Sequence, residues 1–150
     1  MEIFLVQHGE AKSEEEDPQR PLTDKGKEDV SRVAETVAKM NLKIEQILHS
    51  GKTRARQTAE IFAKYLRMAK IEEIKGIGPL DDPYLAKELI EKSDNNLMIV
   101  GHLPHLSKLV SLLIINNPER EIVKFKMGGL LGLKKTETGW FITCFFTPGL

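Results

Sequence analysis

The sequence contains a single cysteine and no long apolar run, and it has no excess of charge of either sign. Cys144 cannot form a disulfide within the chain, and 150 residues can bury a sufficient core without one. The most apolar segment, Leu109 to Ile115, is much shorter than the roughly 20 residues of a membrane span. Polar residues soon after Met1 exclude a signal peptide. We therefore expect one domain over residues 1–150 that is cytoplasmic and does not bind membranes.

The 22 Lys and Arg residues balance 22 Asp and Glu residues. Proteins that bind nucleic acid usually carry a basic excess that meets the phosphates, so this balance argues against that class. The charges are unevenly placed, however, because residues 10–17 are mostly acidic whereas residues 52–70 are mostly basic. We interpret the acidic run as a solvated loop. The small size and the even charge favour a monomer.

Short apolar runs alternate with segments whose apolar residues recur at helical spacing. This order predicts an α/β fold, a three-layer α/β/α sandwich whose central sheet is mostly parallel and ends in a C-terminal antiparallel hairpin at one edge. The expected strands are Glu2–Val6, Ile44–Leu48, Ile71–Ile74, Leu97–Val100, Ile122–Met127, Leu130–Lys134 and Trp140–Phe146, and the expected helices are Thr23–Met40, Thr53–Leu66, Tyr84–Lys92 and His105–Ile115.

In such sheets, ligands bind beyond the carboxyl ends of the strands. Gln7 to Ala11 follows the first expected strand, Ser50 to Thr58 follows the second, and Gly101 to His105 follows the fourth. Two histidines and an arginine from these segments would meet at one edge of the sheet. Arginine offers a planar fork to phosphate oxygens, and neutral imidazole is an uncharged nucleophile. The sequence therefore predicts a site that handles phosphate.

A metal site is an alternative for the same edge. His102 and His105 have a spacing found among metal ligands, but zinc needs at least a third protein ligand. Glu10 or Asp81 can supply one, so the alternative stays open, although we expect no metal. We expect His105 to be incidental to the site.

The four segments that follow or precede the expected elements resemble those of the histidine phosphatase superfamily, which has the phosphoglycerate mutase-like fold. Within it, they are most similar to the small bacterial SixA-type phosphohistidine phosphatases. The resemblance covers nearly the whole chain, in the order of the family. The matching segments are Gln7 to Ala11, Arg20 to Gly26, Ser50 to Ala59 and Val100 to Pro104.

The resemblance implies a role for each matching residue. His8 corresponds to the nucleophile, Arg54 to the arginine that binds phosphate, and His102 to the second catalytic histidine. The reaction that it implies is metal-independent and needs no cofactor. The residues that it implies beside the substrate are Gln7, Gly9, Arg20 at the pocket mouth, and Gly101.

One position departs from the pattern of the family, which has Arg-His-Gly where this chain has Gln7-His8-Gly9. A fixed positive charge at transition-state oxygens is worth roughly a few kcal/mol, and the amide of Gln7 carries none. Another cation, Arg20 or Arg56, can supply the charge that the arginine of the family provides. The alternative to an active phosphatase is a catalytically impaired module that binds phosphate or a phosphoprotein.

The resemblance implies that the substrate is a phosphohistidine in a protein or a small phosphomonoester. The short loops of the chain fit an open site, which suits a protein-borne phosphohistidine better than a small sugar phosphate. The general acid is not assigned by the resemblance; Glu10, Asp81 and Asp82 are candidates by position only.

Overall fold

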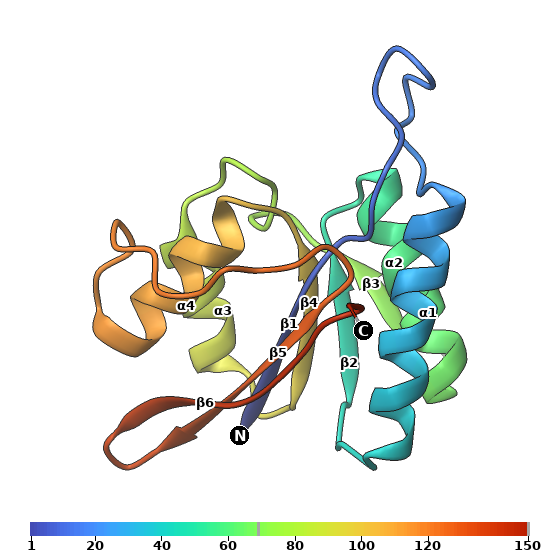
Figure 1. Cartoon of the computed structure of the whole chain (residues 1–150). Helices are drawn as coiled ribbons and strands as arrows, with labels where there is room; N and C mark the ends of the chain where they lie inside the picture. Colours follow the sequence, from blue (N-terminus) through green and yellow to red (C-terminus); the bar gives the residue numbers. More distant parts are fainter. Residues whose placement is uncertain (69, 150) are drawn as a thin grey trace.

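The computed structural model of the chain describes residues 1–68 and 70–149, and its central feature is a six-stranded sheet between two layers of helices (Figure 1). The strands are β1 (Glu2–Gln7), β2 (Gln46–His49), β3 (Ile71–Glu73), β4 (Leu97–Gly101), β5 (Leu130–Thr136) and β6 (Gly139–Phe146), and the helices are α1 (Asp24–Lys39), α2 (Thr53–Leu66), α3 (Pro83–Lys92) and α4 (His105–Ile115). The strand order is β3-β2-β4-β1-β5-β6. The first four strands run parallel, and β5 and β6 are antiparallel.

β1 lies inside the sheet, between β4 and β5, and its side chains build the core on both faces. Ile3 and Leu5 pack into a cluster with α3 and α4, whereas Phe4 and Val6 pack into a cluster with α1 and α2. All four side chains are fully buried. A strand that is covered on both faces carries consecutive apolar residues, which explains the unbroken run in this segment. The predicted three-layer α/β sandwich is confirmed.

The carboxyl ends of three strands lie at the same edge of the sheet. β1 pairs in parallel with β4 and places Gln7 opposite Gly101. β2 pairs in parallel with the other side of β4 and places His49 opposite Val100. The residues that directly follow these strands therefore start from neighbouring positions.

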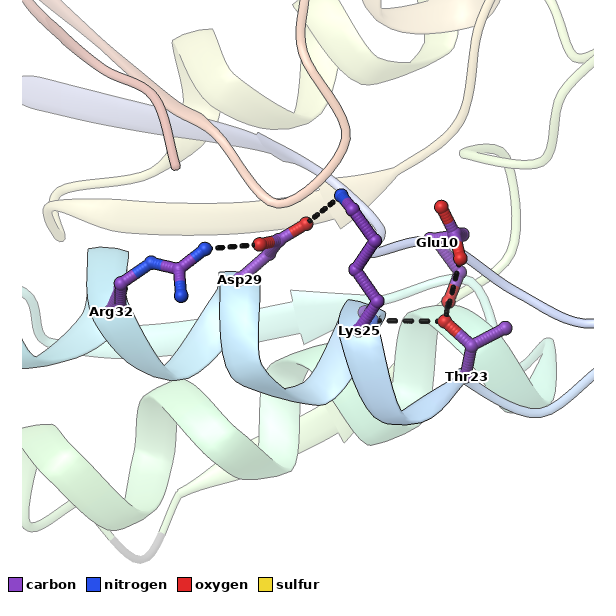
Figure 2. A network of polar contacts seen from close by, with 6 residues as sticks. Glu10, Thr23, Lys25, Asp29 and Arg32 are labelled. Carbon is purple, nitrogen blue, oxygen red and sulfur yellow. Dashed lines mark hydrogen bonds and ion pairs between the residues drawn. The ribbon is translucent and has the colours of Figure 1, made fainter. Parts of the chain in front are cut away.

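The start of α1 is tied to the loop that follows β1 (Figure 2). Thr23 caps the helix by accepting a hydrogen bond from its first turn, and its hydroxyl donates to Oε1 of Glu10 at 2.9 Å. One turn further on, the buried carboxylate of Asp29 pairs with both Lys25 and Arg32. These contacts hold the segment after β1 and the N-terminal half of α1 as one unit.

One predicted strand is wrong: Ile122–Met127 forms no strand. Val123 and Phe125 in this segment are nevertheless buried, against the core cluster on the α3 and α4 face. The alternating pattern here therefore reflects burial without strand pairing. The other expected elements are present, with ends shifted by at most two residues. Within the described residues, no helix has the length and apolar composition needed to cross a membrane.

Gly26 allows α1 to approach the backbone of Glu10, because a Cβ at this position would overlap the carbonyl oxygen of Glu10. Gly26→Ala should therefore lower the free energy of unfolding by about 1–3 kcal/mol, although alanine is the better helix former. Urea denaturation measures this difference. Lys27→Ala, at an exposed position of the same turn, is the control and should change stability little. A Gly26→Ala protein as stable as the wild type would contradict the close approach.

Candidate active site

Two histidines and a serine meet beyond the carboxyl ends of β1, β2 and β4. His8 follows β1 and His102 follows β4, and the centroids of their rings lie 5.1 Å apart. The backbone N–H of His8 donates to the carbonyl of Gly101 at 3.1 Å, which continues the pairing of the two strands. Ser50 follows β2, and its Oγ lies 2.6 Å from Nε2 of His102. The structure thus brings both sequence-predicted histidines into one site.

The ring of His8 is oriented by the backbone of the next residue. Its Nδ1 lies 2.7 Å from the carbonyl oxygen of Gly9. Because a carbonyl only accepts hydrogen bonds, Nδ1 carries the proton and Nε2 keeps a free lone pair. Burial lowers the pKa of His8 to about 4, and the positive charges of Arg54 and Arg20 act in the same direction. At neutral pH, His8 is therefore an uncharged imidazole with an available nucleophilic nitrogen.

Gly9 lies in a narrow space between α1 and α2. Its N–H donates to Oγ1 of Thr58, on α2, at 3.0 Å. A Cβ at Gly9 would lie 2.7 Å from a methyl group of Val30, on α1. Glycine is required here because any side chain would push the backbone after His8 away from α1.

His102 is buried, and its Nε2 is hydrogen-bonded to the hydroxyl of Ser50. The Ser50 hydroxyl also accepts from the backbone N–H of Lys52 at 3.4 Å, and we assign its own proton to the hydrogen bond with Nε2 of His102. The ring proton of His102 is then on Nδ1, which is buried and has no partner within residues 1–68 and 70–149. Burial, and then the charges of His8 and Arg54, lower the pKa of His102 to about 3. His102 therefore offers a neutral N–H donor.

Two guanidinium groups lie near the histidines. Arg54 is in the first turn of α2, and its buried Nε has no partner in the part of the chain that is described. Arg20 donates from Nε to the carbonyl of Lys12 at 3.0 Å. Burial and the charge of Arg20 lower the pKa of Arg54. Two like charges held beside neutral imidazoles favour the binding of an anion.

Gln7 occupies the last position of β1 and is nearly buried. Its Oε1 has no hydrogen-bond partner among the described residues. Gly101 lies opposite Gln7 in the sheet, as noted above. Arg56 does not supply the missing charge, because its guanidinium pairs with Glu60 at 3.2 Å further along α2. Arg20 is instead the second cation whose charge acts on His8.

The three carboxylates considered as general acids all accept hydrogen bonds from other groups of the chain. Glu10 accepts from Thr23, whereas Asp81 and Asp82 accept from backbone N–H groups around the start of α3. Asp81 also lines a surface cavity of about 690 Å³ that begins at Ser50. None of the three is therefore free of a structural role.

The metal alternative receives no support. Over residues 1–68 and 70–149, no group of three or more His, Cys, Asp and Glu side chains is placed to hold a metal ion. Nε2 of His102 is engaged by Ser50. His105 is completely buried at the start of α4, and burial lowers its pKa while Asp81 and Asp82 raise it.

Sequence reasoning missed two residues of the site, Ser50 and Thr58. Ser50 pairs with His102, and Thr58 holds the backbone of Gly9. Their positions within the segment Ser50 to Ala59, which carries the family resemblance, are the signal that can identify them. Their partners lie 52 and 49 residues away in the sequence, so only the folded chain reveals the contacts.

The low pKa values of His8 and His102 should be visible in an NMR titration. Both imidazoles should stay neutral at pH 5.5, because protonation is opposed by burial, whereas histidines of the urea-unfolded chain should titrate near 6.5. The unfolded chain then binds more protons between about pH 4 and 6.5, so the free energy of unfolding should fall as the pH falls through this window. Titration of either ring near pH 6.5 in the folded protein would contradict the buried, neutral pair.

The tautomer of His102 provides a test of the role of Ser50. In the wild type, 15N NMR should show the proton of His102 on Nδ1. Ser50→Ala removes the donor to Nε2, so the proton should shift toward Nε2. Ser107→Ala, which removes a buried hydroxyl on α4, is the control and should leave the tautomer of His102 unchanged. An unchanged His102 spectrum in Ser50→Ala would refute this role.

Comparisons with known proteins agree with this geometry. The model of the histidine phosphatase superfamily (branch 1) matches residues 3–78 of this chain. The chain is 30% identical over 141 residues to an uncharacterized protein of Picosynechococcus sp. (strain ATCC 27264 / PCC 7002 / PR-6). The aligned region covers 89% of this chain and 85% of that protein.

The SixA proteins are similar in sequence and in fold. The chain is 28% identical over 117 residues to the phosphohistidine phosphatase SixA of Escherichia coli (strain K12), across 74% of this chain and 73% of SixA. The structure of the protein histidine phosphatase SixA complexed with tungstate has the same fold, with a TM-score of 0.86 and 23% identity over 99% of this chain and 97% of that one. This chain therefore belongs to the histidine phosphatase superfamily, branch 1, and its fold is that of the SixA proteins.

Proposed function

We propose that this phosphatase hydrolyses phosphohistidine carried on proteins, with His8 as the nucleophile. The observation that carries the proposal is the hydrogen bond from Nδ1 of His8 to the carbonyl of Gly9, which leaves Nε2 free beside His102. A neutral imidazole approaches a negatively charged phosphoryl group without repulsion. The similarity to the E. coli phosphohistidine phosphatase SixA supports the choice of substrate.

The proposed reaction has two steps. Nε2 of His8 attacks phosphorus in line, a P–N bond forms to His8, and the P–N bond to the substrate imidazole breaks as that imidazole takes up a proton from solvent. Water then attacks phosphorus and loses a proton to solvent, the P–N bond to His8 breaks, and inorganic phosphate leaves as neutral His8 is restored. Holding both reactants in line supplies much of the rate enhancement for such transfers.

The phosphoryl oxygens would be held by donors that the site already presents. Nδ1–H of His102 and Nε–H of Arg54 are buried donors without a partner in the described chain. Phosphate oxygens are strong acceptors, so binding would satisfy both groups. The tungstate held by the related SixA structure is an oxyanion and is consistent with this type of binding.

The leaving group favours phosphohistidine over a phosphomonoester. An alkoxide leaves slowly without an acid, whereas an imidazole leaves readily once it is protonated. Glu10, Asp81 and Asp82 are all engaged in hydrogen bonds to other groups, so a substrate that does not need a strong acid fits this site better.

The test uses free phosphohistidine as substrate in the presence of EDTA. The wild type should release phosphate and form a covalent phosphoprotein that can be trapped by rapid acid-free quenching. His8→Ala should lose both the intermediate and the turnover, by at least about 10³-fold. Arg54→Ala should weaken turnover while His8 remains available. Turnover that survives in His8→Ala, or that requires a divalent ion, would disprove the mechanism.

The variant Gln7→Arg tests whether the missing positive charge at position 7 limits the rate of the reaction. A fixed cation beside the phosphoryl group should raise kcat, by up to about 10²-fold, if charge limits the reaction. Gln7→Leu is the matched variant, since it has a similar size but neither charge nor hydrogen bonding. If the wild type binds tungstate without turning over any substrate, the chain is an impaired phosphate-binding module and the proposal fails.

A further inference from the structure

From the structure we infer that a surface groove leads from the active site, past β3, to α3, and that it binds the polypeptide carrying the phosphorylated histidine. The inference rests on the proposed function, because it names the surface that would recognise a protein rather than a free phosphorylated compound. The groove consists of two hollows that meet at Ile74, as described below.

The first hollow opens at the active site. It has a volume of about 690 Å³ and extends from Ser50 to the loop before α3, which contains Leu80. Ser50 also contacts His102, so this hollow borders the active site on the side of His102.

The second hollow lies between the edge of the sheet and α3. Its volume is about 500 Å³, and Ile74 lines both hollows. A Cβ added to Gly76, in the first hollow, would lie 3.7 Å from Leu85, in the second. The two hollows are therefore adjacent. The apolar side chains that line the second one are Leu48, Ile74, Leu85, Leu89 and Leu97.

Large apolar side chains are exposed along this path. Leu80 is 90% exposed and Leu85 is 54% exposed. The turn that carries Leu80 is held in shape, because Asp81 accepts from the N–H of Gly78 at 2.7 Å and Asp82 caps α3. Because the backbone of this turn is already ordered, binding through Leu80 needs little further ordering of the main chain.

The lining chemistry favours a polypeptide over a small substrate. Lys52 and Lys75 line the first hollow together with Glu73 and Asp81, so both signs of charge border the entrance. The second hollow has an apolar floor with Glu88 and Lys92, which pair with each other, on its rim. An apolar floor with a polar rim matches the anatomy of protein interfaces. A small phosphomonoester would reach only the first hollow.

The occupant is therefore a segment of a phosphoprotein with apolar side chains near its phosphorylated histidine. Continuity with the active site ties this surface to the substrate. A phosphoryl group bound at His8 would place the rest of the partner over the first hollow and its neighbouring residues over the second.

The experiment compares hydrolysis of the phosphorus–nitrogen bond in free phosphohistidine and in a phosphorylated protein domain. The two probes are free phosphohistidine and a histidine-containing phosphotransfer domain that has been phosphorylated on its histidine with phosphoramidate. The double variant Leu80→Asp/Leu85→Asp should raise KM for the phosphorylated domain by about tenfold or more, because buried charge replaces two apolar contacts. Its kcat/KM for free phosphohistidine should stay within about twofold of the wild type.

Met40→Asp is the control, since Met40 is 52% exposed at the end of α1, away from the groove. It should leave both probes unaffected. Unchanged KM for the phosphorylated domain in the double variant, or an equal loss with both probes, would overturn the groove while the proposed function stands. Turnover of neither probe by the wild type, or of free phosphohistidine alone, would refute the proposed function itself.

Discussion

The parallel pairing of β1 with β4 is the constraint on which the site depends. It places Gln7 opposite Gly101, and the next residue of each strand is a histidine. The hydrogen bond from the His8 backbone to Gly101 extends the pairing by one step, so the positions of the two imidazoles follow from strand register. A slip of one residue would turn Ile3 and Leu5 toward the wrong helices as well. Core packing and site geometry are thus secured by the same register.

Burial then sets the chemistry of these residues. An exposed imidazole would be partly protonated near neutral pH, but both histidines are removed from water and have a pKa well below 6.5. Backbone and hydroxyl contacts select the tautomers: the carbonyl of Gly9 accepts a hydrogen bond from Nδ1–H of His8, and we assign the Ser50 hydroxyl as the donor to Nε2 of His102. One ring is left as a nucleophile and the other as a donor. Two identical side chains therefore gain opposite capacities from their surroundings.

The sequence predicted the fold because each element follows a local pattern. Apolar runs and helical spacing define the elements, and the rule for parallel sheets points to the residues after β1, β2 and β4. The hydrogen bond between Ser50 and His102 could not be predicted from the sequence, because only the tertiary structure brings these two strand ends together. The strand prediction at Ile122–Met127 is wrong because alternation reports burial and not pairing: Val123 and Phe125 are buried without belonging to a strand.

The neutral residue at position 7 is consistent with the electrostatics of the site. Burial and the charge of Arg20 already lower the pKa of Arg54, so the two guanidinium groups repel each other. A third cation at Gln7 would lie in a buried position and add to that repulsion, at the expense of stability. An amide avoids this penalty but gives up charge that would stabilise the transition state. Functional sites commonly balance stability against activity in this way, and here the balance concerns a single side chain next to His8.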